Sequence, residues 1–182
     1  MNKNFKIKNN LVLSEPSDWI KENLTKNIND LTLLDIACGN GRHSIYASSI
    51  GYKVISLDIS REKISALASK KSIFPVQIDI EKKNTWPFTD KTFDAIIVTN
   101  YLYRPIFQNI INSIKLNGIL LYETFSIENS KLGKPSNPNY LLKPQELLCL
   151  AKKQGMEIIN YEEIVLEYPI KKALQRIYAR IK

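Results

Sequence analysis

Residues 34–43 read LDIACGNGRH, a stretch in which an apolar run gives way to a short turn of small residues. The apolar run predicts a buried strand, and the residues from Arg42 onward predict the start of a helix. Gly39 and Gly41 can adopt backbone angles closed to other residues and let a ligand approach the main chain. The free N–H groups and the dipole at the helix start favour an anionic group there. Taken alone, the same pattern also fits a simple tight turn.

The segments around this turn alternate between short apolar runs and helical patterns. Strands are expected at 31–36, 52–58, 74–79, 93–99 and 119–125, and such apolar runs are typical of a parallel sheet buried on both faces. Helices are expected at 17–29, 60–70, 105–116 and 144–154, with Ser60 as an N-cap and with Gly118 and Gly155 just after the last two.

The C-terminal part breaks this alternation. Residues 156–166 and 173–182 read as two strands with little room for a helix between them, so they must pair antiparallel. The whole pattern predicts an α/β fold, a doubly wound Rossmann-like three-layer sandwich with a mostly parallel sheet that ends in an antiparallel hairpin.

The length of 182 residues and the composition predict one globular domain, with an N-terminal helical segment at 1–30. No apolar stretch approaches ~18 residues, and the apolar run at 11–13 is too short for a secretory signal. Cys38, Cys149 and a single histidine, His43, give neither a disulfide framework nor zinc-ligand spacing. We therefore expect no metal, no membrane and a cytoplasmic location.

The net charge of +8 raises the question of a nucleic-acid partner. The excess is mostly lysine, scattered singly, with one local concentration at 171–182. Nucleic acid is therefore possible but not favoured over a small-molecule partner, and the chain is expected to be a monomer or a homodimer.

Polar side chains stand at or near the ends of four predicted strands: Asp35, Asp58, Asp79 and Asn100. Ligands of open α/β sheets bind at these carboxyl ends. Asp58 follows Gly41 at the spacing where a carboxylate accepts both ribose hydroxyls of a nucleoside, and Asp79 with Ile80 would lie beside an adenine. Ser44 replaces the third glycine of a dinucleotide fingerprint, and a Gly-Lys-Ser/Thr phosphate loop is absent from the sequence.

The order of LLDIACGNGRHS, Asp58, IDIE, FDAIIVTNYLYRP and GILLYETF resembles the class I S-adenosylmethionine-dependent methyltransferases over nearly the whole chain. With the segment GKPSNPNYLLKPQEL, the narrower resemblance is to the small bacterial tellurite-resistance-type methyltransferases. The resemblance implies a seven-stranded sheet with an antiparallel last strand and S-adenosyl-L-methionine as cofactor. Ala37 stands where the family usually has its first glycine.

The resemblance also implies which residues hold the cofactor. Residues 37–41 would cradle the methionine part, Asp58 would hold the ribose, and Asn100 with Tyr101 would close the methyl-donor side. Arg42 is either a partner of the cofactor carboxylate or simply solvated, and His43 is expected to pack or cap. The full predicted cofactor set is Asp35, Ala37, Cys38, Gly39, Asn40, Gly41, Arg42, Asp58, Ile59, Asp79, Ile80, Asn100 and Tyr101.

Methyl transfer is an in-line displacement in which the protein supplies alignment and a dry cavity. A general base helps only where the acceptor carries a proton, and the candidates are Tyr101, Tyr103 and Glu123, although both tyrosines equally suit packing. Arg104 would attract an anionic acceptor or be solvated.

The long polar segment 126–143 is predicted to cover the substrate, with a disordered insertion as the alternative. Its possible substrate contacts are Lys134, Ser136, Asn137 and Tyr140. A small-molecule methyltransferase leads this interpretation; an RNA- or protein-directed methyltransferase and a non-catalytic cofactor-binding module remain as alternatives.

Overall fold

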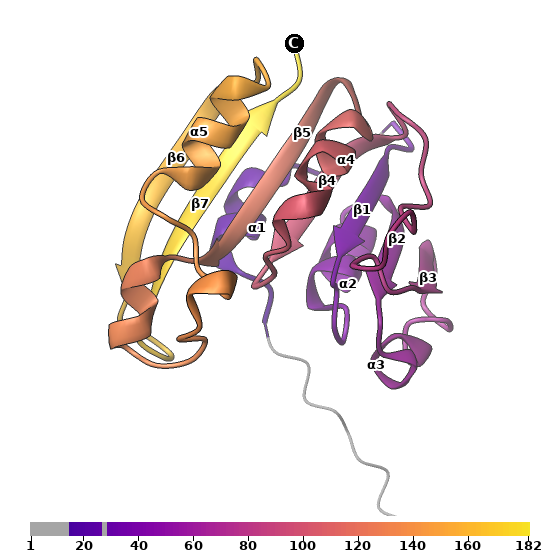
Figure 1. The fold of residues 1–182 in the computed structure, drawn as a ribbon. Coiled ribbons are helices and arrows are strands. Elements are labelled where there is room, and N and C mark those ends of the chain that lie inside the picture. Colours follow the sequence, from indigo (N-terminus) through magenta and orange to yellow (C-terminus); the bar gives the residue numbers. More distant parts are fainter. Residues whose placement is uncertain (1–14, 27–28) are drawn as a thin grey trace, which may run out of the picture.

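The computed structural model describes residues 15–26 and 29–182. Its seven strands form one sheet in the order β3-β2-β1-β4-β5-β7-β6 (Figure 1). Only β7 runs opposite to the other six strands, because it pairs antiparallel with both β5 and β6 while the other pairs are parallel. The predicted fold is confirmed. The strands are β1 Thr32–Ile36, β2 Lys53–Asp58, β3 Ile73–Gln77, β4 Phe93–Thr99, β5 Ile114–Phe125, β6 Glu157–Leu166 and β7 Lys172–Arg180.

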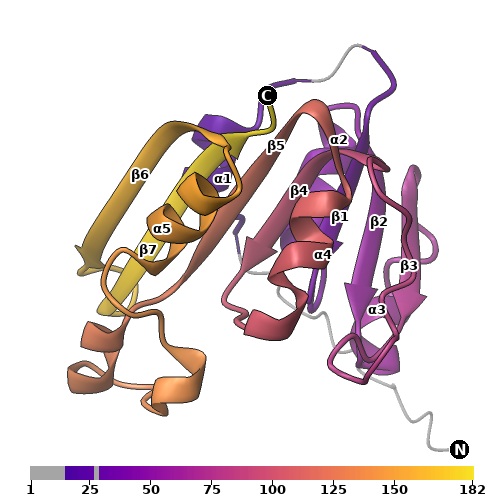
Figure 2. The same cartoon turned by 45° about the horizontal axis from the view of Figure 1, so that its top comes forward.

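Helices cover both faces of the sheet, which makes three layers (Figure 2). On one face α1 (Asp18–Asn23), α2 (Arg42–Ser49) and α3 (Arg61–Ser65) pack in a core that includes Leu33 of β1. On the other face α4 (Phe107–Asn112) and α5 (Glu146–Lys153) pack in a core that includes Leu34. Since successive strand residues point to opposite faces, the uninterrupted apolar run of β1 is what two covered faces require.

The helix predicted at 105–116 is wrong at its C-terminal end. After the short 3₁₀ helix η1 (Arg104–Ile106), α4 ends at Asn112 and β5 begins at Ile114, which pairs with Phe93. Gly118 therefore lies inside β5, at a register shift, and does not follow a helix. A Cβ on Gly118 would lie 2.7 Å from Cγ2 of Ile114, so the close approach requires glycine. Ile114 continues the helical apolar stripe, which is why periodicity alone extended the helix.

The other helices begin near their predicted starts. Ser60 caps α3, with its hydroxyl accepting from the Lys63 N–H at 3.4 Å, and Gly155 follows α5 with φ +69°. The helices α1 and α3 end earlier than the predicted 29 and 70. The parts of the N-terminal prediction that cover residues 1–14 and 27–28 fall outside the described residues. Within the ranges 15–26 and 29–182, no helix combines the length and apolar character needed to cross a bilayer.

Candidate functional site

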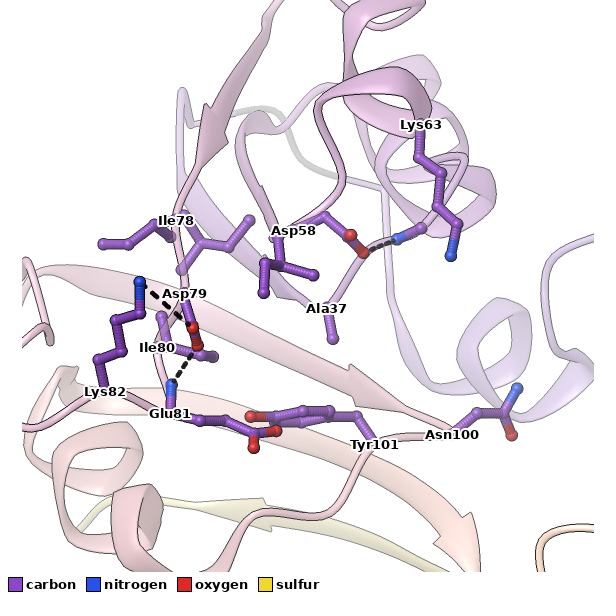
Figure 3. A pocket seen from close by; sticks show the side chains of 13 residues that line it. Ala37, Asp58, Lys63, Ile78, Asp79, Ile80, Glu81, Lys82, Asn100 and Tyr101 are labelled. Atoms are coloured by element: carbon purple, nitrogen blue, oxygen red, sulfur yellow. Dashed lines mark hydrogen bonds and ion pairs between the residues drawn. The ribbon is translucent and has the colours of Figure 1, made fainter.

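A cavity of about 520 Å³ opens at the carboxyl ends of β1, β2 and β4 and beside the segment that follows β3. The sheet order reverses between β1 and β4, and this switch point is where open α/β sheets bind ligands. Figure 3 shows the side chains that line the cavity. They are Ala37, Gly39, Leu57, Asp58, Ile59, Lys63, Ile78, Asp79, Ile80, Glu81, Lys82, Asn100 and Tyr101.

The turn after β1 is built from left-handed residues. Ala37, Gly39 and Gly41 have φ values of +52°, +57° and +76°. A Cβ on Gly39 would meet nothing within 4 Å, whereas one on Gly41 would lie 2.5 Å from Cδ2 of Leu67. The two glycines therefore serve different purposes: Gly39 leaves open space beside the cavity that it lines, and Gly41 lets α2 begin close against Leu67.

Asp58 joins this turn to the end of β2. Its Oδ2 accepts from the Gly39 N–H and its Oδ1 from the Ser60 N–H, both at 2.8 Å. The side chain is nearly buried, yet it lines the cavity (Figure 3). Each carboxylate oxygen has two lone pairs, so both oxygens can accept a further hydrogen bond from a vicinal diol.

The wall opposite the turn combines apolar and charged side chains. Ile59, Ile78 and Ile80 supply apolar surface, and Ile59 is 62% exposed at the cavity. Oδ1 of Asp79 accepts from the Glu81 N–H at 3.1 Å, and its Oδ2 lies 3.8 Å from Nζ of Lys82. These contacts form a slot whose apolar sides suit a flat ring, with hydrogen-bonding groups at its edge.

Lys63 and Lys82 line the cavity, although neither was among the site residues predicted from the sequence. Lys63 lies in the first turns of α3, the helix that begins just after Asp58. Helical side chains point back toward the N-terminus, so a lysine here returns over the end of β2. That direction was the available signal for Lys63. Lys82 follows the IDIE stretch, and its place three residues after Asp79 was the signal for an ion pair.

Asn100 and Tyr101 form the floor of the cavity where β4 ends. Asn100 has φ +52°, and its N–H donates to the Glu123 carbonyl at 2.9 Å. The Tyr101 ring lies across the cavity with its hydroxyl toward Glu81 (Figure 3). Burial, followed by the charge of Glu81, raises the pKa of the Tyr101 phenol far above its ordinary value. Tyr101 is therefore a neutral wall of the cavity at neutral pH.

The other two candidate bases form contacts of their own and do not line the cavity. The Tyr103 hydroxyl donates to the Glu81 carbonyl at 3.0 Å. Glu123 is buried; it accepts from the Ser17 hydroxyl at 3.0 Å and lies 2.7 Å from Nε of Arg176. Neither residue is among the lining side chains of the cavity. A general-base role for Tyr103 or Glu123 stays a prediction.

The remaining residues of the predicted cofactor set lie around the turn without lining the cavity: Asp35, Cys38, Asn40, Gly41 and Arg42. Nη1 of Arg42 donates to the Glu15 carbonyl at 3.0 Å, so its guanidinium already has a partner. Cys38 is buried, and Asn40 is exposed.

His43 packs beneath the turn. Its Nε2 accepts from the Ser17 N–H at 3.1 Å, and its Nδ1 lies 3.2 Å from the Thr99 hydroxyl. Burial lowers its pKa to about 3, which keeps the ring neutral. These contacts agree with the packing interpretation.

The predicted substrate contacts also lie away from the cavity. Arg104 forms hydrogen bonds with Glu146 and with backbone carbonyls. Four exposed residues of the segment 126–143 complete this set: Lys134, Ser136, Asn137 and Tyr140. Among the described residues, no group of three or more His, Cys, Asp or Glu side chains could hold a metal ion.

Asp35 gives a prediction for pH dependence. It is fully buried, its Oδ2 accepts from the Ser44 hydroxyl at 2.6 Å, and burial raises its pKa to about 7. The native state therefore binds more protons than the unfolded state between the ordinary pKa of 3.8 and about 7, and the free energy of unfolding falls as pH rises through this window. Asparagine keeps the acceptor for Ser44 but cannot ionise.

The difference in free energy of unfolding, Asp35→Asn minus wild type, should therefore increase by roughly 2 kcal/mol as the pH rises from 5 to 8. Urea unfolding of both proteins at the two pH values measures this difference. A stability difference that does not change with pH would contradict the assignment.

Comparison with known proteins agrees with this geometry. Residues 33–118 match a protein family described as a methyltransferase domain. The matched segment runs from β1 to the register shift in β5 and contains every residue that lines the cavity. The chain has the fold of the class I S-adenosylmethionine-dependent methyltransferases, and the resemblance predicted from its sequence is confirmed.

Among individual proteins, the chain is similar to TehB of Haemophilus influenzae, with a TM-score of 0.72 and 25% identity. This match covers 91% of the chain and 62% of TehB. An S-adenosylmethionine-dependent methyltransferase of Mesorhizobium loti shares the fold, with a TM-score of 0.72 and 15% identity over 88% of this chain and 95% of that one. YqeM of Bacillus subtilis (strain 168) is 30% identical over 107 residues, 52% of this chain and 42% of YqeM. The chain thus spans less than two thirds of TehB and less than half of YqeM.

Proposed function

We propose that this protein is an S-adenosyl-L-methionine-dependent methyltransferase that methylates a small molecule. The observation that carries the proposal is the Asp58 carboxylate, held against the Gly39 N–H at the edge of a switch-point cavity. A vicinal diol placed there would meet two fixed acceptors, as the ribose of the cofactor requires.

The other lining residues fit the rest of the cofactor. The open space beside Gly39 would take the methionine part, and the slot of Ile59, Ile80 and Asp79 would take the adenine. The face of the Tyr101 ring would lie on the methyl-donor side, where an aromatic face attracts a cation. The bound cofactor supplies a methyl group already activated on a sulfonium sulfur.

The residues of the cavity then have to align the cofactor with the acceptor and exclude water, and they do not have to move protons. Tyr101 stays a neutral phenol, and the Asp58 carboxylate accepts from two N–H donors and would hold the ribose. We therefore propose an acceptor that presents a lone pair or arrives deprotonated, and an in-line displacement that needs no metal.

An RNA- or protein-directed methyltransferase is the second candidate, because the C-terminal residues include a basic cluster. Three of its five basic side chains have acidic partners: Arg176 lies beside Glu123 of β5 and Glu162 of β6, Arg180 lies 3.7 Å from Glu157, and Lys171 lies 3.0 Å from Glu167. This pairing reduces the positive surface that a phosphate backbone would need and favours the small molecule.

Two further properties belong to the proposal. Cys38 and Cys149 are unpaired thiols, which suits a reducing compartment such as the cytoplasm. We also propose that the protein acts as a monomer or a homodimer.

Titration calorimetry with S-adenosyl-L-methionine tests the proposal, with binding expected at micromolar concentration. An acceptor panel that includes oxygen, sulfur and nitrogen nucleophiles and chalcogen oxyanions should yield S-adenosylhomocysteine. Cofactor binding without product over the panel and with RNA would favour a non-catalytic module. Product formed only with RNA, with strong inverse salt dependence, would favour the second candidate.

A further inference from the structure

The segment 126–143 between β5 and α5, named the arch here, is closed and braced by hydrogen bonds. Ser126 and Leu142 form a parallel bridge, and the Ile127 N–H donates to the Leu142 carbonyl at 2.8 Å. Buried Asn129 braces the inside: its Nδ2 donates to the Pro135 carbonyl at 3.0 Å, and its Oδ1 accepts from the Ala173 N–H at 3.1 Å. The arch is therefore an ordered structure tied to β7, unlike the disordered insertion considered above.

Arg104 ties this arch to two other segments. Its Nε and Nη2 donate to the two carboxylate oxygens of Glu146, at 2.5 and 2.8 Å. Its Nη1 donates to the Asn139 carbonyl at 3.0 Å and its Nη2 to the Leu141 carbonyl at 2.9 Å. Glu146 also accepts from the Lys143 N–H at 2.8 Å. The Arg104 guanidinium thus joins the loop after β4 to residues 139–141 of the arch and to the start of α5.

The same loop forms the floor of the cavity. Asn100 and Tyr101 line the cavity three or four residues before Arg104, and the Tyr101 carbonyl accepts from the Tyr122 hydroxyl at 3.0 Å. The arch starts where β5 ends, and β5 runs parallel to β4, so the arch and the floor meet at one edge of the sheet. If the distance between the arch and the floor is fixed, the space through which an acceptor enters the cavity is fixed as well.

We propose that Arg104 is a positioning residue, which holds the arch in place against the loop after β4 and so shapes the acceptor side of the cavity. This inference rests on the proposed function. It replaces the expected role of Arg104 as a free cation for an anionic acceptor, because four of the five N–H donors of the guanidinium are occupied by Glu146 and two carbonyls. The planar fork of arginine matches this set of acceptors, whereas the point charge of lysine does not.

The test compares Arg104→Gln with a matched control, Lys131→Gln, by hydrogen exchange and calorimetry. Lys131 belongs to the same arch, but its ion pair with Glu128 is exposed to solvent. In Arg104→Gln we expect the amides of Tyr140, Leu141 and Leu142 to exchange at least about tenfold faster, because they open locally. In Lys131→Gln these amides should exchange at the wild-type rate, and both variants should bind S-adenosyl-L-methionine within about threefold of wild type.

With an acceptor identified, Arg104→Gln should raise the KM for that acceptor at least about tenfold at saturating cofactor, and Arg104→Lys should not restore it. Glu146→Gln keeps Arg104 and should give the same exchange pattern, so it decides the matter if Arg104→Gln does not fold. The inference would be overturned if the arch amides of Arg104→Gln exchange at the wild-type rate. A loss of cofactor affinity as large as the rise in the acceptor KM would overturn it as well. If wild type binds no cofactor, the proposed function fails on that result, while the exchange rates still decide whether Arg104 holds the arch.

Discussion

The variant Asp58→Asn is expected to bind S-adenosyl-L-methionine at least about 100-fold more weakly than wild type, which corresponds to about 2.7 kcal/mol. The carboxylate offers two charge-assisted hydrogen bonds to a ribose, each worth about 1.5–3 kcal/mol. Asparagine keeps one oxygen but places an NH₂ group against either Gly39 or Ser60, where the native carboxylate accepts at 2.8 Å. The turn beside the ligand is disturbed as well.

Asp90→Asn is the matched control, because Asp90 is an exposed acid outside the cavity lining. Titration calorimetry on both variants measures the affinities, and thermal unfolding checks that both remain folded. Equal cofactor affinity in wild type and folded Asp58→Asn would show that this carboxylate does not hold the ribose.

The second large effect is expected for Gly39→Ala. The φ of +57° at Gly39 makes alanine strained by roughly 1 kcal/mol, but no atom within 4 Å would meet the new methyl group. The fold should therefore survive. Gly39 lines the cavity, so a methyl group there would occupy space that the ligand needs, and we expect at least about a tenfold loss of cofactor affinity.

Gly155→Ala separates strain from binding. Gly155 has φ +69° and equally open surroundings, yet it follows α5 outside the cavity lining. Both alanine variants should lose similar stability in urea unfolding, while only Gly39→Ala loses cofactor affinity. Gly41→Ala should mainly destabilise the protein, because its Cβ would lie 2.5 Å from Leu67. Wild-type affinity in Gly39→Ala would contradict the position proposed for the methionine part.

The sequence predicted well those features that depend on local patterns, namely the apolar strands and the polar residues at their ends. The apolar runs end at Asp58 and Asn100, and parallel topology brings such ends to one edge, so the cavity and several of its polar residues followed from the pattern. The end of α4 could not be predicted, because Ile114 fits a helical stripe and a strand equally well until its pairing with Phe93 is known.

Partners distant in sequence could not be predicted in the same way. Arg104 finds Glu146 42 positions later, and nothing in the local pattern near Arg104 distinguishes a paired guanidinium from a free one. Glu123 similarly meets Arg176 only through the antiparallel register of β5 and β7. Long-range pairing of this kind changes the role that a charged side chain can take.

A crystal structure of the protein with S-adenosylhomocysteine tests the central claim most directly. We expect ribose hydroxyls within hydrogen-bond distance of both Asp58 oxygens, adenine between Ile59 and Ile80, and the sulfur on the Tyr101 side. Density for the ligand at another place, or a ribose turned away from Asp58, would contradict it.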